Sequence, residues 1–95
     1  MTERSTVILE LARNELLGSG EDAASHAVLS VGFPLLRAGR ALDEVLAVHR
    51  ATPDDRAALQ RAAHRAIGAL EAAYGRLQRV RHVEAYQVLL NIAYS

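Results

Sequence analysis

The side chains best suited to chemistry in this sequence are four histidines, at positions 26, 49, 64 and 82. Asp22 and His26 form the one carboxylate–histidine pair at a spacing of four residues, which on a helix places two side chains on the same face. A zinc site needs three or four convergent ligands, and the histidine spacing supplies no such set. We therefore predict no metal site, and we expect His49 simply to offset the dipole at a helix C-terminus.

The residues that commonly carry catalysis are also missing. Cysteine and lysine are absent, so the chain offers no thiolate nucleophile, no lysine base and no cysteine-based metal site. The sequence contains no glycine-rich phosphate loop, and no serine stands in a triad-like arrangement with a histidine and a carboxylate. We predict a non-enzymatic protein with no catalytic residues, no cofactor and no small-molecule substrate.

Arginine could still carry a function, because its guanidinium group pairs bidentately with phosphate. Four arginines fall on one face of a helix predicted over 53–80, and small residues separate them: Arg61, Arg65, Arg76 and Arg79. Such a smooth basic stripe could follow a phosphate backbone. The same face lies opposite the apolar seam of the helix, where a solvated helix carries charge, and no aromatic residues interleave for base stacking. Nucleic-acid binding is therefore the alternative to a protein-binding function.

The charge of the chain is balanced in total but unevenly distributed. Eleven arginines oppose eleven acidic residues. Residues 1–55 carry five Arg and nine acidic residues, a net −4, and residues 56–95 carry six Arg and two Glu, a net +4. Such asymmetry marks either a nucleic-acid surface or two halves that attract each other, within the chain or across a dimer. We favour the second interpretation.

Length and composition favour one helical domain over residues 1–95. Hydrophobic residues make up 51% of the chain, mostly Ala and Leu, and aromatic residues make up 4%. Small side chains permit close approach of helices but fill little volume, which suits helices better than a β-sandwich. No apolar run reaches the roughly 20 residues of a membrane span, and no signal peptide is visible, so we expect a cytoplasmic protein without a membrane partner.

Apolar periodicity and breaker residues predict an all-α, up-down bundle of four to five helices, over about 3–17, 21–31, 34–50, 53–80 and 82–93. The first helix should bury one face: Ile8, Leu9, Leu11, Ala12 and Leu16. Gly18-Ser19-Gly20 should end that helix, and Gly32-Phe33-Pro34 should break or kink the chain because Pro34 lacks an amide proton. The second break could also be the turn of a helix-turn-helix, although Asp43 and Glu44 on the following helix would repel phosphate.

The strongest local signal is Thr52-Pro53-Asp54-Asp55, which predicts the start of a helix at Pro53. Thr52 would accept hydrogen bonds from the first-turn amides, and the two aspartates would oppose the helix dipole. An apolar seam then repeats for three heptads: Leu59, Ala63, Ala66, Leu70, Ala73, Leu77 and Val80. The spacing changes near Val80–His82, so residues 53–93 form either one helix or two.

Helix lengths predict unequal coverage of the two ends of the bundle. At ~1.5 Å per residue, the segments 21–50 and 53–80 would each span ~42 Å and run antiparallel. The first and last helices would each cover only ~20 Å, at the end away from Thr52. The seam near Thr52 would then be under-covered, and we expect a homodimer or an obligate partner protein there.

These patterns predict a small helical interaction module that acts as a homodimer through protein–protein contacts. We expect a regulator, adaptor, inhibitor or immunity-type protein. The last helix should join the contact surface, because it is apolar almost all round and requires burial on most sides. The candidate interface residues are Leu42, Val45, Leu46, Leu59, Ala63, Ala66, Val83, Tyr86, Leu89, Leu90, Ile92 and Tyr94.

Overall fold

The computed structural model describes residues 1–26, 29–77 and 82–95, and it confirms the all-α fold. Four helices occupy these ranges: α1 (Glu3–Ser25), α2 (Leu29–Ala51), α3 (Arg56–Leu77) and α4 (Val83–Ala93). No strand occurs within them. In the same described ranges, no helix combines the length and the hydropathy that crossing a membrane would require.

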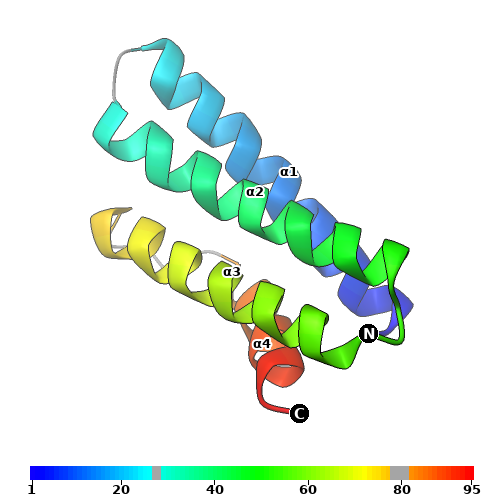
Figure 1. Ribbon diagram of the computed structural model, residues 1–95. Helices are drawn as coiled ribbons and strands as arrows, with labels where there is room; N and C mark the ends of the chain where they lie inside the picture. Colours follow the sequence, from blue (N-terminus) through cyan, green and yellow to red (C-terminus); the bar gives the residue numbers. More distant parts are fainter. Residues whose placement is uncertain (27–28, 78–81) are drawn as a thin grey trace.

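Three long helices run back and forth, and the short α4 closes one end of the bundle (Figure 1). α2 packs antiparallel to both α1 and α3, while α4 packs against α3 and α1. α4 begins beside the middle of α1 and runs toward the end that holds the N-terminus and the α2–α3 connection. The bundle measures 41 × 22 × 20 Å, so α4 covers only part of its length.

The helix end predicted at Gly18-Ser19-Gly20 and the break predicted at Gly32-Phe33-Pro34 are wrong, and at Pro34 the alternative of a helix that runs through is the one that forms. α1 runs through Gly18-Ser19-Gly20, and α2 runs through Gly32-Phe33-Pro34. The chain reverses once instead, after α1 ends at Ser25. Pro34 lies in the second turn of α2, where its missing amide removes one intrahelical hydrogen bond, and packing against α1 offsets that loss. The helix-turn-helix interpretation fails as well, because its turn lies inside α2.

The glycines in these segments allow α1 and α2 to approach closely. A Cβ atom added to Gly20 would lie 2.8 Å from the Cγ atom of Leu36. One added to Gly32 would lie 3.0 Å from both the carbonyl oxygen of Gly20 and the amide nitrogen of Ala24. Because the obstructing atoms at Gly32 belong to the α1 backbone, they cannot move aside as a flexible side chain could. Packing between helices therefore outweighs the weak helix propensity of glycine here.

The connection between α2 and α3 is capped differently from the prediction. α3 begins at Arg56, and the Asp55 carboxylate, rather than Thr52, accepts a hydrogen bond from a first-turn amide at 3.0 Å. The Thr52 hydroxyl instead donates to the carbonyl of Val48 at 3.1 Å and so caps the end of α2. Pro53 occupies the second position of a turn closed by the Asp55 amide on the Thr52 carbonyl. Proline is favoured at that position because its φ angle is already set.

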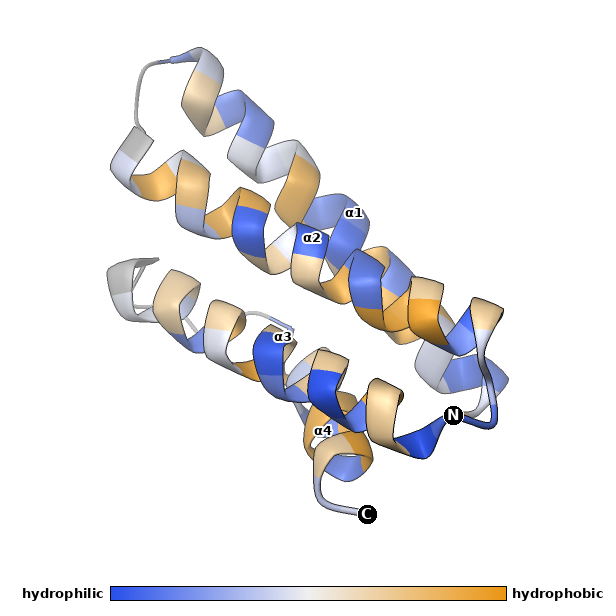
Figure 2. Cartoon of the chain, viewed as in Figure 1, coloured by the Kyte–Doolittle hydropathy of each residue, from blue (hydrophilic) through white to orange (hydrophobic). Residues whose placement is uncertain are grey.

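The core consists mainly of Ala and Leu side chains from all four helices, and hydrophobic and hydrophilic positions alternate along each long helix (Figure 2). The buried hydrophobic residues are Leu9, Ala12, Leu16, Leu35, Ala38, Leu42, Val45, Leu46, Ala62, Ala63, Ala66, Ile67, Leu70, Ala73, Ala85, Leu89 and Ala93. The predicted heptad seam is confirmed at its central positions, Ala63, Ala66, Leu70 and Ala73.

The expected buried face of α1 is wrong at Leu11, which is 65% exposed. The buried positions of this helix follow a spacing of three, four and four residues: Leu9, Ala12, Leu16 and Gly20. Leu11 lies away from that line, since a residue two positions from a core residue points to another side of the helix. Ile8 is half-buried at the edge of the core.

After the Thr52 turn, the described residues form two helices, α3, which ends at Leu77, and α4, which begins at Val83. Residues 78–81 lie outside the described ranges, but His82 is described. Its φ of 62° is left-handed, and in the described ranges it is the one residue other than glycine with a positive φ. The left-handed region disfavours side chains with a Cβ atom, so the packing of His82 must offset this cost.

Replacing Gly32 with alanine should destabilise the fold, because the added methyl group would meet the α1 backbone. We expect a loss of about 1–3 kcal/mol in the free energy of unfolding, the usual cost of overpacking, measured by urea denaturation. Gly68→Ala is the matched control, since Gly68 lies in α3 and an added methyl group there would point into open space. This control should gain about 1 kcal/mol from helix propensity. Equal stabilisation by both substitutions would contradict the close approach of α1 and α2.

Candidate interaction surface

A groove lies where the N-terminal half of α4 meets α1. It has a volume of about 320 Å³, and the residues that line it are Ile8, Leu11, Ala12, Glu15, His82, Val83, Glu84 and Ala85. Five of these residues are apolar, and the exposed Glu15 and Glu84 add two carboxylates to the lining. Helical spacing places these side chains on facing sides of α1 and α4, since residues three and four apart share a face.

Three large hydrophobic side chains are exposed at this groove. Leu11 is 65% exposed, Val83 is 51% exposed and Val7 is 48% exposed. Leu11 and Val83 both line the groove, and Val7 lies one helical turn from Leu11 on α1. We call Val7, Leu11 and Val83 the exposed apolar patch. It joins α1 to the start of α4, two segments about 70 residues apart in the sequence.

A polar cluster from three elements lies beside the groove. His82 Nε2 is 3.8 Å from Glu15 Oε1, and the imidazole ring stacks on the ring of Tyr74, with centroids 6.5 Å apart. The His82 side chain is only 11% exposed, whereas that of Glu15 is 51% exposed. Tyr74 belongs to α3, so the cluster ties the start of α4 to both α1 and α3.

The Tyr74 hydroxyl has an unusual environment. It is buried, and no hydrogen-bond partner for it occurs among the described residues. Burial and the nearby charge of Glu15 disfavour the phenolate form, and together they raise the pKa of Tyr74 to about 12. Tyr86 of α4 differs, because its hydroxyl donates to Glu71 at 2.8 Å, and that hydrogen bond raises its pKa above the ordinary value.

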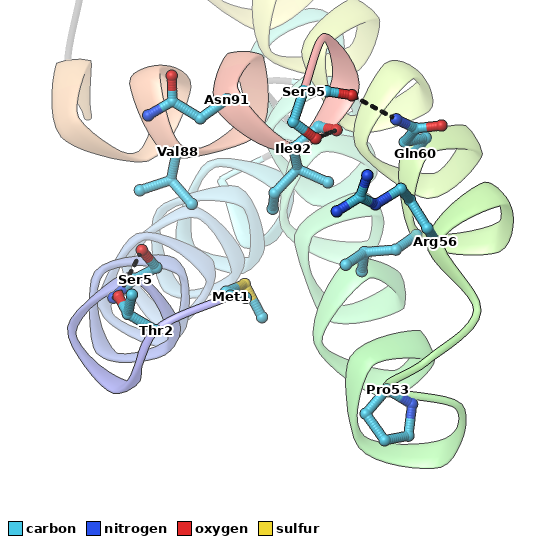
Figure 3. A pocket seen from close by; sticks show the side chains of 11 residues that line it. Met1, Thr2, Ser5, Pro53, Arg56, Gln60, Val88, Asn91, Ile92 and Ser95 are labelled. Carbon is cyan, nitrogen blue, oxygen red and sulfur yellow. Dashed lines mark hydrogen bonds between the residues drawn. The ribbon is translucent and has the colours of Figure 1, made fainter.

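A second hollow lies at the other end of the contact between α1 and α4 (Figure 3). Val88 and Ile92 project from α4 toward the beginning of α1, and Arg56 lies at the rim near the C-terminus of the chain. The Gln60 side chain donates to the Ser95 carbonyl at 3.3 Å across this end. The α1 side of α4 is therefore incompletely filled along much of its length.

The interface residues predicted near the Thr52 turn are buried inside the chain, so the expected under-coverage of this end is wrong. Leu42, Val45, Leu46, Ala63 and Ala66 are at most 2% exposed. Leu59 is half-buried against the core. α1 is as long as α2, and α4 folds back over this end rather than the other. α1 is longer than predicted because it does not end at Gly18-Ser19-Gly20. α4 covers the Thr52 end because the chain reverses its direction between α3 and α4.

The predicted residues on α4 differ in exposure. Leu89 is buried, whereas Val83 and Tyr94 are exposed. The half-buried ones are Tyr86, Leu90 and Ile92. α4 is held to α3 partly by an edge-on contact between the rings of Tyr94 and His64, with centroids 5.1 Å apart. The buried residues of α4 are Ala85, Leu89 and Ala93, and its other apolar side chains remain partly or largely exposed.

The structure describes the side chains of two members of the predicted basic stripe, Arg61 and Arg65, both exposed on α3. Two nitrogens of Arg65 donate to the Glu44 carboxylate of α2. An arginine already paired with a carboxylate contributes less attraction for phosphate. The Arg76 side chain and all of Arg79 fall outside the description, so the stripe as a whole stays a prediction.

The histidines lie apart from one another, as their spacing indicates. His26 ends α1, with Nδ1 2.8 Å from the Asp22 carbonyl, and His49 lies in the last turn of α2. His64 faces Tyr94, whereas His82 stands at the groove. In residues 1–26, 29–77 and 82–95, no three His, Asp or Glu side chains converge to hold a metal ion.

No protein-family model matches this sequence, and no curated protein or solved structure matches it. The groove is lined by apolar side chains from two helices together with two carboxylates, and apolar side chains accompanied by polar groups are the usual composition of a protein-binding surface.

The residues that sequence analysis missed are Val7 and Leu11. The exposure of Leu11 could have been predicted from the spacing, because Leu9, Ala12 and Leu16 already form a buried row on the helix that does not include Leu11. The predicted face grouped Leu11 with Ile8, Leu9, Ala12 and Leu16, and this concealed its exposure. The position of Val83 beside Leu11 had no sequence signal, since it depends on how α4 folds back.

The ionisation of Tyr74 should make the protein less stable at alkaline pH. The ordinary pKa of tyrosine is 10.0, whereas burial and the charge of Glu15 raise the pKa of Tyr74 in the fold to about 12. The contribution of neutral Tyr74 to the free energy of unfolding is complete below pH 10. It is lost as the pH rises from 10 to about 12, because the unfolded state then releases a proton that the folded state keeps. Chemical denaturation over this range should show the decline, and Tyr86 should add to it.

Tyr74→Phe is the control for this prediction. It removes the titrating group and a buried hydroxyl without a described partner, so stability at pH 7 should stay equal or rise by up to about 1 kcal/mol. The alkaline decline should be smaller in this variant. An unchanged decline would show that Tyr74 is not the group responsible.

Proposed function

We propose that this protein is a small, non-enzymatic interaction module that binds a partner protein through the exposed apolar patch. The observation that carries the proposal is the 65% exposure of Leu11 on a helix whose opposite face is packed in the core. Single apolar residues scattered on a surface need no explanation, but a group around one groove indicates a contact site. Such a module would act in the cytoplasm as a regulator, adaptor, inhibitor or immunity-type protein, by occlusion or scaffolding.

The patch has the physical properties that a contact site requires. Covering a half-exposed Val or Leu side chain contributes about 1 kcal/mol to the free energy of binding, so burial of all three side chains would favour association. Both supporting helices are fixed by the core through Leu9, Ala12 and Leu89, so little order must be gained on binding. The carboxylates of Glu15 and Glu84 in the lining would select a partner with basic groups beside its apolar surface.

Nucleic-acid binding through the arginine stripe is the competing proposal, weakened by the Arg65–Glu44 pair. The two proposals differ in salt dependence and in the residues required. Binding to generic RNA or DNA that falls steeply with salt and is lost in Arg61→Glu would favour the stripe. Under the interaction-module proposal, such binding should be weak and Arg61→Glu should leave partner binding unchanged.

A photo-crosslinking amino acid at position 11 tests the proposal directly. In cells that express the protein, this probe should form a discrete crosslink to a protein, because position 11 would lie inside the contact. The same probe at position 47, an exposed site on α2, is the matched control and should give no such product. The absence of any protein crosslink specific to position 11 would contradict the proposal, whatever the partner.

A further inference from the structure

The outward face of α1 carries opposite charges at the two ends of one stripe of side chains. Arg4, Val7, Leu11 and Glu15 follow one another at spacings of three, four and four residues, and all four are exposed. This spacing places them on a single stripe of the helix. The stripe therefore starts with a cation, continues with two apolar side chains and ends with a carboxylate.

Such a stripe is self-complementary when two copies lie antiparallel. In a two-fold pair, residue i of one copy lies opposite residue j of the other, and j opposite i. The midpoint between positions 7 and 11 is position 9, and the midpoint between positions 4 and 15 is 9.5. An axis at residue 9 thus places Val7 opposite Leu11 of the second copy and Arg4 one position from Glu15 of the second copy, a distance that the long Arg side chain spans.

The rest of the surface agrees with this arrangement. Val83 lies beside Leu11 in the groove and extends the apolar contact onto α4. The Glu15 side chain, which contacts His82, is 51% exposed, and a carboxylate accepts several hydrogen bonds at once. A parallel arrangement in the same register would place the two Arg4 side chains together and the two Glu15 side chains together, which like-charge repulsion disfavours.

We propose that the partner of the exposed apolar patch is a second copy of this chain, packed antiparallel along α1 about a two-fold axis near residue 9. This inference rests on the proposed function and names its partner. One pair of helix faces covers less area than the roughly 800 Å² per partner of a standard stable interface, so the dimer is weak and depends on concentration.

Sedimentation velocity on the full chain over a range of concentrations, combined with charge exchange, tests this arrangement. Arg4→Glu and Glu15→Arg should each weaken dimerisation about tenfold or more, because each places like charges opposite each other. The double variant should restore it to within a few-fold, because the charges are then exchanged at both ends. Loss of the Glu15–His82 contact alone would not produce such a restoration. Arg61→Glu, an exposed reversal on α3, is the control and should have no effect.

Leu11→Ala provides a second readout, since a residue this exposed can be shortened without loss of the fold. It should weaken dimerisation about tenfold, with helical content unchanged by circular dichroism. A monomer at every concentration would overturn the inference. So would a dimer whose affinity is unchanged by Leu11→Ala, or a loss of affinity in the single charge reversals that the double variant does not restore. A crosslink from position 11 to a different protein would overturn it while leaving the proposed function intact.

Discussion

The structure depends on the close approach of α1 and α2. The chain has one Phe and no Trp, so a core of Ala and Leu can exclude water only if the helices come near one another. Gly20, Gly32 and Gly39 make that approach possible, because a Cβ atom at each would lie 3.0 Å or less from an atom of the facing helix. Side chains larger than hydrogen at these positions would force the helices apart.

This contact fixes which face of α1 remains outside. With Gly20 and Leu16 directed inward, helical geometry turns Leu11 and Val7 toward solvent. α4 then completes the bundle over the half that contains the Thr52 connection, held by Leu89 in the core and by the Tyr86–Glu71 hydrogen bond. The exposed apolar patch is thus a consequence of how the core is packed.

Sequence patterns predicted the helical class and the central positions of the heptad seam on α3, because these depend on local periodicity. They failed where a residue has two physical roles. Gly18-Ser19-Gly20 and Pro34 are helix breakers by propensity, yet tertiary packing carries the helices through them. Thr52 and Asp55 are both good caps, and only the turn geometry decides that Asp55 caps the start of α3. The position of Val83 beside Leu11 required the fold of α4.

The central claim is that α1 presents Leu11 to a second chain rather than to its own core. The most direct measurement is an isotope-filtered NOE experiment on a mixture of labelled and unlabelled protein at millimolar concentration. The proposed dimer predicts intermolecular cross-peaks between the Leu11 and Val7 methyl groups. Cross-peaks from Leu11 to core methyl groups of its own chain, such as those of Leu42, with no intermolecular signal from Leu11, would contradict it.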